Sequence, residues 1–225
     1  MKTSPELEQA SIVFLGSFNP AIFHPSWFAA HDLIPCDDQK VPKGINRTLV
    51  LPEITDFSTE DFSLQVQAQR FALRTTNASF YESLRDLAYS TFSILHHTPI
   101  IKMGLNRDFH FRMPDIDAWH EIGHRLAPKE HWKGLLHHPG LRHLSMEGER
   151  QDDYKGFIRV IVEPSNEIKP HGVHIGVNDH YEVHDPEKNK GSIELIEILQ
   201  KMWSKSINSA SKTAQTIIWG EEMTT

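Results

Sequence analysis

Apolar and polar positions alternate most clearly along two segments, and this alternation predicts two long strands. Over Ile101–Met113 the odd-numbered positions are apolar except for Arg107, and Gly172–Val183 follows the same pattern. Successive side chains of a strand point to opposite faces, so each segment predicts one buried and one polar face. The stretches MGLNRDFHFRMP (103–114) and IGVNDHYEVHDP (175–186) also align without gaps. The match indicates either a weak internal repeat or a coincidence between two amphipathic strands.

Shorter apolar runs predict further strands. Ser11–Ser17 is an apolar run that leads into the turn sequence GSFNP, and Thr48–Ile54 is broken by Pro52, as is typical of an edge strand. The segment FSLQVQAQRFALR (62–74) alternates but shifts its phase by one residue near Gln69–Arg70. Such a shift indicates a β-bulge or a bend within one strand. Two more strands are expected at Leu141–Glu149 and Gly156–Glu163.

Helical spacing of apolar residues predicts the remaining elements. One or two helical turns are expected in PSWFAAHDLI, and a short helix is expected over Asp115–Leu126. The sequence Ser79-Phe-Tyr-Glu82 matches a capping box and predicts a helix that ends near His97. A long amphipathic helix is predicted over Ser192–Ile218. Its apolar stripe includes Trp203, so we expect it to pack across the sheet or to form a dimer contact.

Together these elements predict an α+β fold. We expect an antiparallel-rich sheet, helices mainly on one face, two loosely similar halves and a long C-terminal amphipathic helix. The 225 residues are enough for a single compact domain over 1–225. The internal repeat predicts halves at 11–97 and 98–218, followed by a tail at 219–225.

The composition indicates where the protein is located and which partners it is expected to bind. The formal net charge of −7 argues against broad electrostatic binding to nucleic acid. Cys36 is the single cysteine, so the chain has no disulfide framework, and a reducing cytoplasm is the expected compartment. The N-terminal residues lack the apolar core of a signal peptide, and there is no apolar run of about 18 residues that could span a membrane. We therefore expect a cytoplasmic protein without a membrane partner.

The motif HEIGH raises the possibility of zinc in this histidine-rich chain, which has 15 histidines. In an HExxH helix, two histidines one turn apart hold Zn²⁺ and the glutamate activates water. His120 and His124 would be the ligands and Glu121 the catalytic base. However, Pro128 ends the helix soon afterwards, and the apolar stripe places both histidines on its outer flank. A zinc-dependent hydrolase is therefore the alternative interpretation.

Four sequence blocks resemble a sporadically distributed family of uncharacterised bacterial proteins. The blocks are LGSFNPAIFHPSWF, GLNRDFHFRMP, AWHEIGHRLAPKEHW and VNDHYEV, and the resemblance extends from about residue 11 to residue 183. In that family the position of Glu121 need not be acidic, which implies that His120 and Glu121 are not a catalytic pair. The resemblance implies a bacterial protein with a link to defence-type gene neighbourhoods, and no established activity.

The polar faces of the two long strands form the remaining candidate site. They are interpreted either as a solvated surface or as a surface for a ligand or partner. The candidate binding residues are Asp108, His110, Arg112, His174, Asn178 and His180.

Two charged residues interrupt the apolar faces of these strands. Arg107 and Asp179 occupy matching positions of the repeat, and a lone buried charge is costly. If the strands are neighbours, the two residues are predicted to form an ion pair beneath the sheet. The alternative is a bulge after Asn106 and Asn178 that turns each charge out to water.

By elimination, the sequence favours a non-catalytic interaction or accessory protein over an enzyme. It would need no cofactor and would belong to a larger assembly of the defence type. Its partner would be another protein, or a second copy bound through the C-terminal helix. The zinc-dependent hydrolase stays as the alternative.

Overall fold

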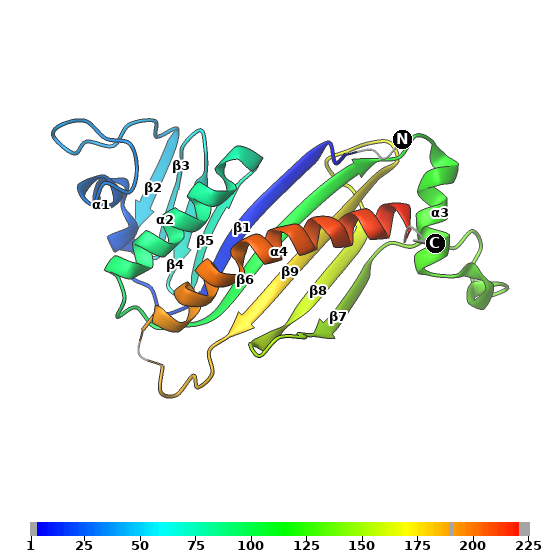
Figure 1. The fold of residues 1–225 in the computed structure, drawn as a ribbon. Coiled ribbons are helices and arrows are strands. Elements are labelled where there is room, and N and C mark those ends of the chain that lie inside the picture. The colour runs from blue at the N-terminus through cyan, green and yellow to red at the C-terminus, as the bar shows by residue number, and fades with distance from the viewer. Residues whose placement is uncertain (1–3, 190, 221–225) are drawn as a thin grey trace.

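The computed structural model describes residues 4–189 and 191–220 and contains a nine-stranded sheet with helices packed against one face (Figure 1). The strands are β1 (Leu7–Gly16), β2 (Arg47–Leu51), β3 (Ile54–Ser58), β4 (Ser63–Gln67), β5 (Arg70–Thr75), β6 (Ile100–Arg112), β7 (Leu144–Glu149), β8 (Lys155–Pro164) and β9 (Gly172–Glu182). The helices are α1 (Pro25–Ala30), α2 (Tyr81–Ile94), α3 (Ile116–Leu126) and α4 (Ile193–Trp219), with the 3-10 turns η1 (Pro20–Phe23), η2 (Ala78–Phe80) and η3 (Lys129–Trp132). The predicted α+β class, antiparallel sheet and long C-terminal helix are confirmed.

The strands follow the order β2-β3-β4-β5-β1-β6-β9-β8-β7, and all neighbours are antiparallel. The order of elements is similar in the two parts of the chain: a strand, a helix, a meander of strands and a helix. The first series ends with α2 and the second begins with β6. The two strands that resemble each other, β6 and β9, are neighbours, and Asn106 lies opposite Asn178.

The helices bury one face of the sheet, which we name the covered face. Helix α2 packs against β1 and β5, and α4 packs against β6 and β9. Trp203 of α4 is 0% exposed, which confirms that this helix packs across the sheet. The apolar stripe of α4 is therefore already occupied by its own sheet. None of the helices in the described ranges is both long and apolar enough to cross a membrane. The expected tail lies outside the described residues from position 221 onward.

The segment 62–74 is a hairpin, so the prediction of one bulged or bent strand is wrong. Strands β4 and β5 pair across a two-residue turn, with Val66 opposite Phe71 and Leu64 opposite Leu73. A two-residue turn shifts the alternation by one position and returns the apolar side chains to the same face. The edge position predicted for Thr48–Ile54 is confirmed, because β2 is the outer strand; however, a turn at Pro52 and Glu53 separates β2 from β3, which begins at Ile54.

The start of α2 also differs from the prediction. The capping box at Ser79 does not form; instead the Asn77 side chain accepts a hydrogen bond from the Ser79 N–H and caps η2. Helix α2 begins at Tyr81 and ends at Ile94. Asparagine is as good a cap as serine, and its position two residues earlier adds a 3-10 turn.

The predicted ion pair between Arg107 and Asp179 is wrong. Both side chains are buried on the covered face, but Arg107 pairs with Glu8 of β1 at 2.7 Å, and Asp179 pairs with Arg150. The reason is the strand register. The two charges lie on opposite sides of the central asparagine pair, so each reaches a partner on a different neighbouring segment. The rule that buried charges are paired holds, and no bulge turns them to water.

Candidate functional site

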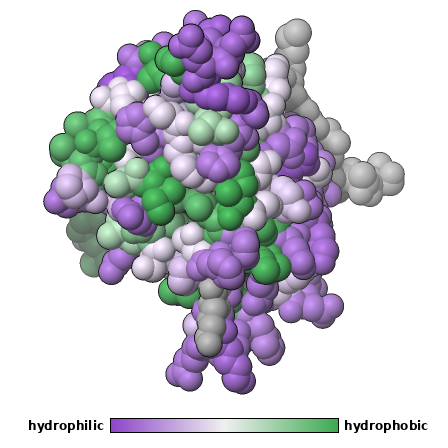
Figure 2. Space-filling view, turned by 90° about the vertical axis from the view of Figure 1, so that its left-hand side faces the viewer, coloured by the Kyte–Doolittle hydropathy of each residue, from purple (hydrophilic) through white to green (hydrophobic). Residues whose placement is uncertain are grey.

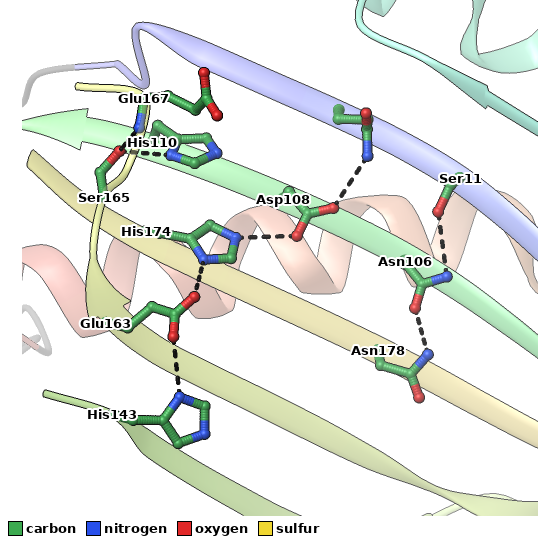
Figure 3. A network of polar contacts seen from close by, with 11 residues as sticks. Ser11, Asn106, Asp108, His110, His143, Glu163, Ser165, Glu167, His174 and Asn178 are labelled. Atoms are coloured by element: carbon green, nitrogen blue, oxygen red, sulfur yellow. Dashed lines mark hydrogen bonds and ion pairs between the residues drawn. The ribbon is translucent and has the colours of Figure 1, made fainter. Parts of the chain in front are cut away.

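The opposite side of the sheet, which we name the open face, carries the polar positions of β6 and β9. Residues on this face alternate with the buried residues of the covered face along both strands. Of the candidate binding residues, the structure places these on the open face: Asp108, His110, His174, Asn178 and His180. Figure 3 shows that Asp108, His110, His174 and Asn178 contact side chains of neighbouring strands and loops.

A chain of polar contacts crosses the open face from β1 to the start of β7 (Figure 3). Gln9 donates to Asp108 at 3.4 Å, and the other Asp108 oxygen lies 3.0 Å from His174 Nε2. His174 Nδ1 lies 3.1 Å from Glu163. The second oxygen of Glu163 lies 3.0 Å from His143 Nδ1. Four strands and the residue before a fifth are thereby connected through side chains.

This geometry favours the protonated form of His174. Its hydrogen bond to Asp108 raises the pKa of His174, and Glu163 raises it further against the opposing effect of burial. The hydrogen bonds from His143 and His174 lower the pKa of Glu163. Both ring nitrogens of His174 are occupied by carboxylates. In this arrangement the ring cannot accept a proton as a general base or offer a lone pair to a metal.

His110 stacks on His174 with ring centroids 4.6 Å apart, but its pKa is shifted in the opposite direction. Its Nδ1 lies 2.8 Å from the Ser165 hydroxyl, which already accepts the N–H groups of Glu167 and Ile168. The hydroxyl proton therefore points to His110, which must be neutral. Burial lowers the pKa of His110, and the nearby His174 charge lowers it further. Ser165 is buried and has no free hydrogen-bonding capacity, so it is a structural residue and not a nucleophile.

A second line of polar contacts runs through the centre of the face. The Asn106 side-chain amide donates to the Ser11 hydroxyl at 3.2 Å, and the Asn178 side-chain amide donates to the side-chain oxygen Oδ1 of Asn106. A Cβ atom at Gly104 would lie 2.8 Å from the Asn178 amide nitrogen. Glycine at this position therefore lets the Asn178 side chain lie across the neighbouring strand. Gly176 has different neighbours, because a Cβ atom there would lie 3.3 Å from an Asp108 oxygen.

The missing side chains at the centre leave a hollow in the open face. It has a volume of about 490 Å³ and is open to solvent. Its floor consists of glycine, serine and asparagine, and its sides are basic and apolar. The lining residues are Ser11, Val13, Leu15, Arg70, Lys102, Met103, Gly104, Asn106, Asp108, Phe157, Arg159, Ile161, Asn178 and His180.

One cation in the hollow has no ion-pair partner among residues 4–189 and 191–220. Lys102 pairs with Glu182 at 2.9 Å, and Arg159 pairs with Glu147 at 2.6 Å. Arg70 of β5 is half-buried and forms no ion pair with any residue of the described chain. A half-buried guanidinium without a counter-ion favours an incoming anionic group.

Two other candidates lie at the border of this hollow or beyond it. Arg112, at the end of β6, is held by Glu6 at 2.7 Å and by the Lys169 carbonyl at 3.1 Å, outside the hollow. His180 lines the hollow and stacks on Phe157 with ring centroids 4.4 Å apart. Burial lowers the pKa of His180, so this ring presents a neutral, planar surface.

The HEIGH residues lie on α3, where Asp115 caps the helix by accepting the Ala118 N–H at 2.8 Å. His120, Glu121 and His124 are all exposed, and the two imidazole centroids are 6.2 Å apart. Among the described residues no three metal-ligating side chains come together. His120 lines a small cavity of about 40 Å³ between α3 and β8, whereas Glu121 and His124 do not line it.

Several residues of the open face were not predicted from sequence. Glu163 and His143 complete the contacts of His174, and Gln9, Ser11 and Arg70 come from β1 and β5. Their own strands showed the correct alternation, but alternation does not reveal which strands are neighbours. The one available signal was the unusual number of ionisable side chains on the polar sides of several strands.

Comparison of the whole chain with known proteins gives no family model that matches and no significant match among curated proteins. The geometry of the open face therefore carries the functional argument.

Proposed function

We propose that the protein is a non-catalytic interaction protein that binds a segment of a partner protein in the hollow of the open face. The observation that carries this proposal is a nine-stranded sheet with one face free of helices and a polar hollow at its centre. The ionisable groups nearby are fixed by one another, as in a rigid recognition surface. The sequence resemblance supports a bacterial host and a defence-type assembly as the setting, and the single cysteine supports a cytoplasmic location.

The lining of the hollow indicates the chemistry of the partner. Arg70 offers an unpaired guanidinium, which suits a carboxylate. The hollow provides apolar contacts from Leu15, Phe157 and Ile161. The Asn178 side chain uses its amide nitrogen as a donor to Asn106, so its side-chain oxygen can accept a backbone N–H of the partner. We therefore expect a segment that carries an acidic side chain next to apolar ones.

Nucleic acid fits this surface less well. Asp108 and Glu182 lie among the cations, and the charges of Lys102 and Arg159 are already neutralised. A phosphate backbone requires a run of uncompensated cations, and here there is one.

A charge reversal in the hollow tests the proposal. Tagged wild-type protein, Arg70→Glu and Arg74→Glu would be expressed in the host cell, and co-purifying proteins quantified. Arg74 is a matched control because it lies on the same strand and face but outside the hollow. We expect a partner that is captured by wild type and Arg74→Glu, and lost with Arg70→Glu. Equal capture by all three proteins would contradict the proposal.

The zinc-hydrolase alternative has its own measurement. Protein purified without chelators or an affinity tag that binds metal would be analysed for bound zinc. About one zinc per chain, lost in His124→Ala together with a hydrolytic activity, would replace the proposal with this alternative. Zinc unaffected by His124→Ala would exclude the HEIGH site.

A further inference from the structure

The two edges of the sheet differ in how well they are protected. Strand β2 and strand β7 each pair on one side only, and no backbone hydrogen bond of the described chain reaches their outer sides. An unpaired edge accepts another strand unless charges, proline or a covering element protect it. Strand β7 carries Glu147 and Glu149. Strand β2 has the sequence RTLVL, and its one charge, Arg47, is paired with Asp56.

The surface around β2 is apolar as well as unprotected. Leu49 and Leu51 are each 46% exposed, and the nearby loop residue Val41 is 52% exposed. Figure 2 shows the end of the molecule that contains α1 and β2, where apolar side chains gather at the surface. An apolar edge strand of this kind is expected to be covered in the functional state.

We propose that β2 pairs with β2 of a second copy of the chain, antiparallel, around a two-fold axis that passes through Leu49. Residues that lie opposite each other in an antiparallel pair point to the same face of the sheet. The open faces of the two copies therefore lie on the same side only if each residue of β2 pairs with a residue that points to the same face as itself. An axis at the middle residue meets this requirement and pairs all five residues. Leu49 then faces Leu49 of the other copy, Thr48 faces Val50, and Arg47 faces Leu51.

The self-complementarity of this register identifies the second copy as the occupant. The pairs of Thr48 with Val50 bring β-branched residues together, which stabilises neighbouring strands. No like charges lie opposite each other, and Arg47 already has its counter-ion within its own chain. If the partner were a strand of a different protein, β2 would not need a sequence that is compatible with itself. The resulting interface is closed by its symmetry and joins two nine-stranded sheets edge to edge.

The first experiment measures mass in solution. Sedimentation of the full chain over a range of micromolar concentrations should give a dimer of the 25.9 kDa chain. Leu49→Lys places two ammonium groups opposite each other and should give a monomer with an unchanged circular dichroism spectrum and an unfolding midpoint that no longer depends on protein concentration. Met146→Lys changes a residue of β7 that is 61% exposed and should leave the dimer intact. A wild-type monomer at all concentrations, or a Leu49→Lys dimer, would overturn the proposal.

The second experiment tests the register. In a Cys36→Ser background, oxidation should crosslink Leu49→Cys, because residues opposite each other in a sheet lie within disulfide range. Leu51→Cys should stay uncrosslinked, because its counterpart lies four positions away along the strand. Crosslinking of Leu51→Cys in preference to Leu49→Cys would refute the register. Both experiments read self-association, so they are independent of whether the hollow binds a partner.

Discussion

The two faces of the sheet use the same strands for different purposes. On β6, the covered face carries Met103, Leu105 and Phe109, which are almost completely buried, and the open face carries Asn106 and Asp108, which are half-buried. The covered face obtains its stability from apolar area removed from water. On the open face the side chains are held by hydrogen bonds and ion pairs with one another. A sheet stabilised by one face leaves the other free for recognition.

The largest expected effect is the loss of apolar packing on the covered face. Trp203→Ala removes a fully buried indole of α4 and should lower the free energy of unfolding by about 3–5 kcal/mol. Trp132→Ala, at an exposed position, should change it by less than about 0.5 kcal/mol. Urea unfolding of both variants measures the difference. A loss of stability for Trp203→Ala as small as that for Trp132→Ala would show that α4 is not essential to the core.

Removal of one carboxylate from each face compares buried and exposed ion pairs. Arg107 is 3% exposed and lies between the rings of Tyr81 and Phe109, with its centre 4.5 and 4.6 Å from theirs. Glu8→Gln leaves this guanidinium without a counter-ion and should destabilise the protein by about 2–4 kcal/mol. Glu147→Gln breaks an exposed pair of the open face and should cost less than about 1 kcal/mol. Chemical denaturation measures the free energy of unfolding of both variants. Equal losses would contradict the contrast between the two faces.

A small substitution tests the packing of the open face. Gly104→Ala would place a methyl group 2.8 Å from the Asn178 amide and should cost about 1–3 kcal/mol, near the lower end because the amide can move. Gly148→Ala, in β7, meets no atom within 4 Å and should be neutral or slightly stabilising. Thermal unfolding of the two variants gives the comparison. A neutral Gly104→Ala would show that Asn178 has no fixed position.

The smallest expected effect is a pH dependence of the polar contacts. The pKa of His174 is raised above its ordinary 6.5, first by Asp108 and then by Glu163. Its charge therefore stabilises the fold fully below pH 6.5, and this contribution is lost as the pH rises through the raised value. His174→Gln should destabilise the protein more at about pH 5.5 than at about pH 8.5, by less than about 1 kcal/mol. Unfolding midpoints at the two pH values measure it, and a larger effect at alkaline pH would reverse the assignment of charge.

The sequence was sufficient for those features that depend on local periodicity. The alternation of β6 and β9 assigned Asp108 and His174 to the polar face, and the spacing around Trp203 predicted the amphipathic α4. Features that depend on strand order were not accessible. Arg107 was matched with Asp179 because both interrupt an apolar face, whereas the register gave each another partner. The hollow itself depends on residues from five strands, several of which are distant in sequence.

The position of β1 at the centre of the sheet has a consequence for folding during synthesis. Strand β1 is synthesised before its partners and pairs with β5 and then with β6, so one half of the sheet can form early. Strand β6 must then wait for β9, and its apolar side chains must wait for α4, which is synthesised later still. Such non-local pairing slows folding and exposes an unpaired strand in the meantime. The nascent chain is therefore most vulnerable to aggregation between the synthesis of β6 and that of α4, and a host chaperone would be needed most in that interval.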